Sequence, residues 1–111
     1  MKDIKYFGKM DNPTSWAYVK GPCGDEMEFY LRIDNDIIEE VKFYTEGCIF
    51  TVACGAMTAH LALGKSIDGA LSISPWTVIN ELEGIPKDHI HCSILAVTSL
   101  YRAITDYLLK E

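Results

Sequence analysis

The chain has 111 residues, of which 49% are hydrophobic and 23% charged, with a formal net charge of −6. This length supports a single domain over residues 1–111 with one core, and the composition excludes a disordered tail or a membrane protein. The negative charge opposes binding to nucleic acid and to anionic lipid. The first residues lack the apolar stretch of a signal peptide, so we expect a cytoplasmic protein.

The first half of the chain predicts a short helix followed by three strands. The first dozen residues space Ile4, Phe7 and Met10 at a weak helical period, which Pro13 ends. Three segments rich in aromatic and β-branched residues follow, which favours strands. They read WAYVKGP from Trp16, EMEFYLRI from Glu26 and IIEEVKFYT from Ile37. The polar turn of residues 34–36 between the last two predicts an antiparallel hairpin.

The second half of the chain predicts helices. Apolar residues recur every three or four positions after the third strand, and Gly64 closes this helix as a C-terminal cap. Residues 66–71 form a short amphipathic piece, and Ser74 and Pro75 begin a further helix as its cap and first residue. A long amphipathic helix begins near Asp88. Strands followed by helices are typical of an α+β domain, here a three-stranded antiparallel sheet covered on one face by helices, with a long C-terminal helix.

Three of the four cysteines fall at junctions between predicted elements, where side chains from distant segments converge. Cys23 lies in a glycine-flanked turn, two residues before Asp25. Cys48 lies at a helix N-terminus, whose free amides and dipole favour an anion. Cys92 follows His91 in the first turn of the long helix, where the helix dipole and an imidazole favour its thiolate. His91 could equally be a plain first-turn residue of that helix. Three thiols and one carboxylate make a metal-ligand set.

Plainer interpretations stay open at several of these positions. A free cysteine is often a small buried apolar residue, and we assign this role to Cys54. Cys54 is six residues beyond Cys48 on the same helix, about 9 Å along the axis, so the two cannot easily share a metal. Asp25 alone is more often a turn or capping residue. We expect His60 to be exposed or at the core edge, and His89 to be a solvated residue at a helix start.

Three ordered sequence blocks carry a resemblance that covers nearly the whole chain; they read GPCGDEM, TEGCIFTVACGAM and IHCSILA. With 24 residues between Cys23 and Cys48 and 43 between Cys48 and Cys92, they resemble the motifs of the iron–sulfur cluster scaffold family of IscU and the NifU N-terminal domain. The spacing is less similar to that of the zinc-containing SufU branch, whose last interval carries an insertion. The resemblance implies that Cys23, Cys48 and Cys92 hold a nascent [2Fe–2S] or [4Fe–4S] cluster, that Asp25 controls its lability and that His91 is an auxiliary ligand.

The sequence departs from this family in two places. The chaperone-recognition motif LPPVK aligns with residues 85–89, which read IPKDH, so the resemblance does not extend to recognition by the dedicated Hsp70-type chaperone. The small, serine-rich helix start of typical members is replaced by residues 49–54, which are bulkier and include the additional thiol of Cys54. Sulfur transfer through that thiol stays an open alternative.

The resemblance implies a scaffold without enzymatic activity of its own. A cysteine desulfurase hands sulfane sulfur to a thiolate, for which we expect Cys92, iron joins it, and the cluster leaves to an apo-protein; a homodimer around a shared cluster stays open. One hard carboxylate, Asp25, in place of a fourth thiolate weakens the hold on the cluster. The alternative is a zinc protein, structural or sulfur-accepting, with the same three cysteines and Asp25. A thiol hydrolase built on Cys92 and His91 is disfavoured, because adjacent helical residues diverge by about 100°.

Overall fold

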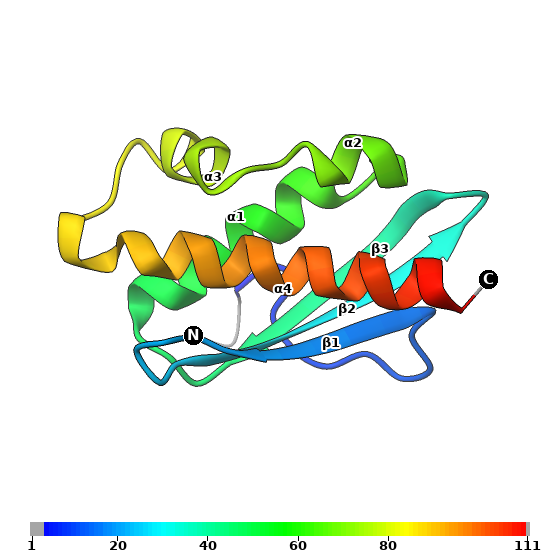
Figure 1. Ribbon diagram of the computed structural model, residues 1–111, viewed down its shortest axis with the longest axis horizontal. Helices are drawn as coiled ribbons and strands as arrows, with labels where there is room; N and C mark the ends of the chain where they lie inside the picture. Colours follow the sequence, from blue (N-terminus) through cyan, green and yellow to red (C-terminus); the bar gives the residue numbers. More distant parts are fainter. Residues whose placement is uncertain (1–3, 111) are drawn as a thin grey trace.

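A three-stranded antiparallel sheet in the order β1–β2–β3 forms one layer, and the helices form the other (Figure 1). The computed structural model describes residues 4–110. Its elements are β1 (Ser15–Lys20), β2 (Glu26–Asp34), β3 (Ile37–Thr45), α1 (Ile49–Ala62), α2 (Ile67–Leu71), α3 (Pro75–Glu81), the 3₁₀ turn η1 (Lys87–His89) and α4 (Ile90–Leu109). The predicted fold class is confirmed. Within residues 4–110, no helix has the length and apolar character needed to cross a bilayer.

The turn between β2 and β3 forms as its residues predict. Asp34 pairs with Ile37, and the two residues between them, Asn35 and Asp36, have φ angles of 53° and 59°. A two-residue loop with two positive φ angles matches the right-handed twist of the flanking strands, and Asn and Asp tolerate this conformation. The hairpin therefore fixes the register of β2 against β3.

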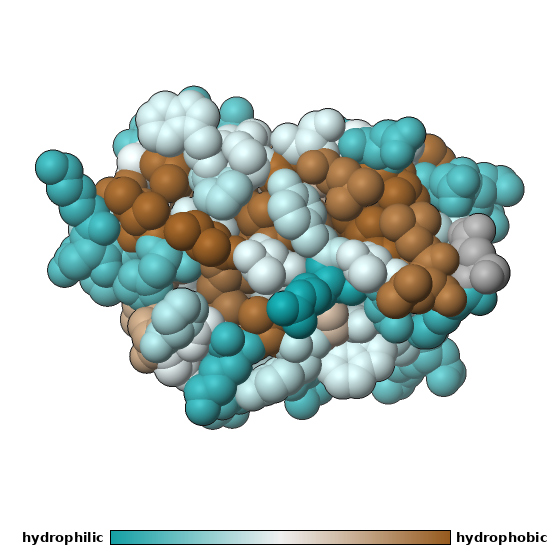
Figure 2. Space-filling view, in the orientation of Figure 1, coloured by the Kyte–Doolittle hydropathy of each residue, from teal (hydrophilic) through white to brown (hydrophobic). Residues whose placement is uncertain are grey.

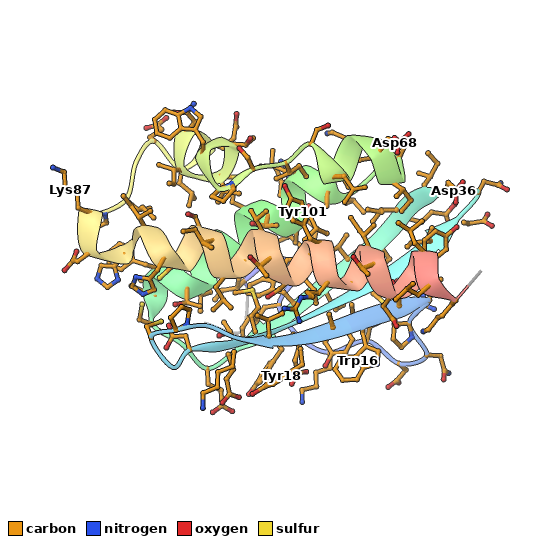
Figure 3. The ribbon with its side chains drawn as sticks, in the orientation of Figure 1. Trp16, Tyr18, Asp36, Asp68, Lys87 and Tyr101 are labelled. Carbon is orange, nitrogen blue, oxygen red and sulfur yellow. The ribbon has the colours of Figure 1, made fainter. Side chains whose placement is uncertain are left out.

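One face of the sheet is buried under the helices. Met27 and Phe29 of β2 and Phe43 of β3 are fully buried, because alternate residues of a strand point to the same face. Helix α4 packs against β1 and β2, and α1 packs against β3. Trp16 and Tyr18 of β1 point away from the helices, to the outer side of the sheet (Figure 3).

The N-terminal segment does not form the predicted helix. The N–H of Gly8 donates to the carbonyl of Phe43 over 2.8 Å, and the N–H of Phe43 donates to the carbonyl of Tyr6 over 2.9 Å. Positive φ angles at Tyr6 (69°) and Gly8 (136°) are incompatible with a helix. Hydrogen bonding to the free edge of β3 therefore outweighs the weak helical preference of this segment. The prediction also included residues 1–3, which lie outside the described residues.

The helices of the second half begin and end close to the predicted residues. Ser74 and Thr77 form a capping box at the start of α3, and Gly64, with φ of 83°, follows the C-cap of α1. The long helix was predicted from near Asp88, and the chain there forms η1 before α4 begins. The hydroxyl of Tyr101 on α4 donates to the carbonyl of Ile73, which ties α4 to the segment before α3 (Figure 3).

Candidate metal-binding site

Cys48 lies in the turn that joins the sheet to the first helix. It is the N-cap residue of α1, and its side chain is exposed. The preceding Gly47 leaves no room for a side chain, because a Cβ there would lie 2.9 Å from Oδ2 of Asp25 and 2.9 Å from Cβ of Thr51. The glycine therefore lets the loop that carries Asp25 pack directly against the start of α1.

His89 and Cys92 reach the same point from the start of α4. Cys92 is in the first turn of α4 and fully buried, and His89 is the last residue of η1. The Sγ atoms of Cys48 and Cys92 and one ring nitrogen of His89 all lie within 4.8 Å of one another. Sγ of Cys48 is 4.0 Å from Nδ1 of His89. Three side chains with metal-binding atoms thus converge from two distant parts of the chain.

Thr51 connects these thiols to the carboxylate of Asp25. Its buried hydroxyl donates a hydrogen bond of 2.7 Å to Oδ2 of Asp25 and lies 3.3 Å from Sγ of Cys92 and 3.5 Å from Sγ of Cys48. Thr51 is not among the site residues predicted from the sequence. Its spacing could have revealed it, since the third residue after Cys48 lies on the same face of α1.

The loop between β1 and β2 carries Cys23 and Asp25. The N–H of Gly21 donates to the carbonyl of Asp25 over 2.7 Å, and the N–H of Gly24 donates to the carbonyl of Gly21 over 3.0 Å. Gly24 has a φ of 97°, which favours glycine. This tight loop directs Asp25 to Thr51, whereas Cys23 is exposed and is not a member of the group formed by Cys48, His89 and Cys92.

The two thiols that meet at Thr51 differ in their acidity. Burial acts to raise the pKa of Cys48, but the hydrogen bond with the Thr51 side chain and those from the N–H groups of Thr51 and Phe50 outweigh it and lower this pKa, as expected at a helix N-terminus. Burial raises the pKa of Cys92, and the hydrogen bond with Thr51 only partly offsets it. The prediction that Cys92 favours its thiolate is therefore wrong, because its side chain is withdrawn from solvent.

The histidines also differ from the sequence-based expectation. His89 was expected to be solvated, but it is half-buried and its ring packs against that of Phe50 in a tilted arrangement, with 4.3 Å between the ring centroids and 32° between the planes. The ring of His91 lies 6.1 Å from that of His89 and is not part of the group with the two cysteines. His60 is exposed, as predicted, with Nδ1 3.2 Å from the hydroxyl of Tyr6.

Cys54 lies in the hydrophobic core, which confirms its predicted role. Its side chain is fully buried on α1, and this burial raises the pKa of its thiol to about 12. A thiol that stays protonated at neutral pH is a poor metal ligand and a poor nucleophile.

A cavity of about 360 Å³ opens beside Asp25, where β2 begins and β3 ends, at the end of the hairpin opposite its turn. Its lining includes four carboxylates and one ammonium group, from Asp25, Glu26, Glu28, Glu46 and Lys9. The Lys9 ammonium lies 3.7 Å from the carboxylate of Glu28. The excess of negative charge gives this side of the site a potential that attracts cations.

This fold, with a carboxylate in the loop between β1 and β2 and thiols at the starts of α1 and α4, is that of a NifU-type N-terminal domain. Residues 1–111 match the family model described as "NifU-like N terminal domain". The chain belongs to this family.

The relatives and a solved structure agree with this assignment. The chain is 40% identical over 105 residues to the iron-sulfur cluster assembly scaffold protein IscU 1 of Archaeoglobus fulgidus, an alignment that covers 94% of this chain and 69% of that protein. It is 35% identical over 112 residues to the iron-sulfur cluster assembly scaffold protein IscU of Escherichia coli K12, covering 99% and 87%. The crystal structure of a NifU-like protein (N-terminal) from Brucella abortus is similar in fold, with a TM-score of 0.74 at 16% identity over 99% of this chain and 90% of that chain.

Proposed function

We propose that this chain is a scaffold on which an iron–sulfur cluster is assembled and from which the cluster passes to apo-proteins. The observation that carries the proposal is the convergence of Asp25, Cys48 and Cys92 around the Thr51 hydroxyl in a chain whose family includes named cluster scaffolds. The chain acts as a single domain over residues 1–111, in the cytoplasm, and it binds the cluster as cargo without catalysing a turnover of its own.

The cluster ligands in this proposal are Cys23, Asp25, Cys48 and Cys92. The last three meet at Thr51, and Cys23 approaches from the same short glycine-rich loop as Asp25. Thiolates suit iron and bridging sulfide, and one carboxylate among them holds iron less firmly than a fourth thiolate does. Such a ligand set binds a [2Fe–2S] cluster well enough to complete it and loosely enough to release it.

Sulfur enters, in our proposal, as a persulfide carried by a cysteine desulfurase. A thiolate of the scaffold attacks the outer sulfur, the S–S bond of the donor breaks, and the donor cysteine leaves as a thiolate. Cys48 suits this role better than Cys92, because Cys48 is exposed to an approaching protein and Cys92 is fully buried. This assignment replaces the sequence-based expectation that Cys92 accepts the first sulfur.

The partner proteins need a surface next to these thiols. Apolar side chains gather over the helical layer towards both ends of α4 (Figure 2). At the end that carries Cys92, Ile90 and Ile94 are exposed, and Ile49 beside Cys48 is 64% exposed. An exposed apolar patch at the rim of a site marks a protein-binding surface. We propose that the desulfurase and the apo-acceptors dock here.

Anaerobic reconstitution with ferrous iron, cysteine and a desulfurase tests the proposed function. We expect visible sulfide-to-iron charge-transfer absorption bands, and we expect their loss in a variant with Cys23, Cys48 and Cys92 all changed to Ser. A wild-type chain without such bands contradicts the proposal. The zinc alternative is tested by metal analysis of protein purified without oxygen, because a structural site holds stoichiometric zinc that chelators remove only as the chain unfolds.

A further inference from the structure

We propose that His89, and not His91, is the histidine that binds a divalent cation together with Cys48 and Cys92. The inference deepens the proposed function and rests on it, because it assigns ligands within the same site. The resemblance to cluster scaffolds pointed to His91, which directly precedes Cys92 in the sequence. The geometry points instead to the residue two positions earlier.

The distances among the three side chains are close to those that a metal ion imposes. A tetrahedral Zn²⁺ with bonds of about 2.3 Å to sulfur and about 2.0 Å to nitrogen keeps its ligand atoms about 3.5–3.8 Å apart. Sγ of Cys48 and Nδ1 of His89 are 4.0 Å apart, and the largest separation within the group is 4.8 Å or less. Side-chain shifts of an ångström or less therefore close the site around an ion.

The ring of His89 is already oriented for this role. It packs against the ring of Phe50, which is two residues beyond Cys48 on α1, and the backbone N–H of His89 donates to the carbonyl of Pro86 over 2.9 Å. The ring contact and the 3₁₀ turn hold Nδ1 towards Cys48, so Nδ1 is the nitrogen placed to bind the ion. A ligand held in its binding orientation loses less conformational entropy when the ion binds.

His91 does not have this orientation. It is the second residue of α4, and side chains of adjacent helical residues point about 100° apart, so a helix that turns Cys92 inwards turns His91 elsewhere. Its ring centroid lies 6.1 Å from that of His89, and His91 is not a member of the group formed by Cys48, His89 and Cys92. The boundary between η1 and α4 is what separates the two histidines.

Two thiolates and one imidazole are a donor set for a borderline cation such as Fe²⁺ or Zn²⁺. Binding releases the two thiol protons, and it requires neither Cys23 nor sulfide. The site therefore accepts a single ion before a cluster exists. Asp25, hydrogen-bonded to Thr51 at the edge of the group, and water are the oxygen donors close to the remaining position.

Zn²⁺ binding to the full chain tests the inference with a matched pair of variants. Competition with a chromophoric chelator measures the Zn²⁺ affinity, and we expect His89→Ala to lower it by at least about tenfold. Removal of a residue that only orients a metal ligand already lowers metal affinity by about tenfold or more. We expect His91→Ala to leave the affinity unchanged. An affinity lost in His91→Ala, or retained in His89→Ala, overturns the inference.

A measurement on the wild-type chain removes any dependence on the folding of the variants. Long-range ¹H–¹⁵N correlation spectra identify each ring nitrogen, and we expect Zn²⁺ to shift Nδ1 of His89 while the ring nitrogens of His91 keep their positions. A shift confined to His91 overturns the inference.

The failure of this inference is distinguishable from the failure of the proposed function. If the chain assembles and transfers a cluster but binds Zn²⁺ through His91, the inference is wrong and the function stands. If Zn²⁺ binds through His89 but no cluster forms with iron and a desulfurase, the site is real and the scaffold function is wrong.

Discussion

The hydroxyl of Thr51 on α1 donates a hydrogen bond of 2.7 Å to Oδ2 of Asp25 in the loop between β1 and β2. The helix that follows Cys48 therefore holds the carboxylate that we assign to cluster release. Asp25 depends for its position on a residue outside the ligand set.

Thr51 and Asp25 should be energetically coupled. We expect a double-mutant cycle with Thr51→Val and Asp25→Ala, measured by urea unfolding of the metal-free reduced chain, to give a coupling of about 1 kcal/mol, within the usual range for a hydrogen-bonded pair. Valine keeps the shape of threonine and removes the hydroxyl, so the cycle isolates the hydrogen bond. Additive effects of the two substitutions would show that the bond contributes nothing.

Of the two thiols beside Thr51, Cys48 should be more acidic than Cys92. Its pKa is lowered, so its thiolate fraction at neutral pH exceeds that of an ordinary cysteine, whose pKa is about 8.5. We expect its rate of alkylation by iodoacetamide, followed by mass spectrometry of peptides, to reach half its plateau at a lower pH than that of glutathione. Cys54 should be modified last, since it is buried with a pKa of about 12. If the alkylation rate of Cys48 reaches half its plateau at the same pH as that of glutathione, or at a higher pH, the prediction is wrong.

Gly47→Ala should disturb the site more than a matched glycine substitution nearby. An added Cβ at residue 47 meets Asp25 and Thr51 at 2.9 Å, whereas one at Gly21 meets its nearest neighbour at an ordinary 3.6 Å. We expect Gly47→Ala to lower the free energy of unfolding by about 1–3 kcal/mol, as overpacking does, and to weaken Zn²⁺ binding. Gly21→Ala should change both much less; equal effects of the two variants would contradict the tight packing at residue 47.

Ile94→Asp should slow sulfur transfer from a cysteine desulfurase, because a charge on the apolar rim must be desolvated when the partner docks. Leu108→Asp is the matched control, since Ile94 is 50% and Leu108 49% exposed on the same helix. The two lie about 21 Å apart along the axis of α4. We expect persulfide formation, measured by mass spectrometry, to slow only in Ile94→Asp. Equal rates in the two variants would remove the proposed docking surface.

The strands and helix ends were predictable because their signals are local. Asn35 and Asp36 form the hairpin turn and Ser74 caps α3, each through contacts within a few residues. The N-terminal segment was not predictable, because it pairs with the edge of β3 at Phe43, far along the chain. Local preference is weak there, and the tertiary partner decides the structure.

The residue types of the site were predictable, but the directions of their side chains were not. The spacing of Cys23, Asp25, Cys48 and Cys92 indicated a shared site. The structure brings the last three to Thr51, whereas Cys23 is exposed and is not part of the group with Cys48 and Cys92. The difference between His89 and His91 depends on the residue at which a 3₁₀ turn becomes α-helix, and sequence patterns locate such boundaries only to within a few residues.

The most direct test of the scaffold function is transfer of a reconstituted cluster to an apo-ferredoxin, followed by circular dichroism under anaerobic conditions. We predict that the wild-type chain gives up its cluster completely and that Asp25→Ala, which removes the weak oxygen ligand, transfers it more slowly. A wild-type chain that retains its cluster in the presence of excess acceptor contradicts the account. Equal transfer rates for the two proteins contradict the role of Asp25 within it.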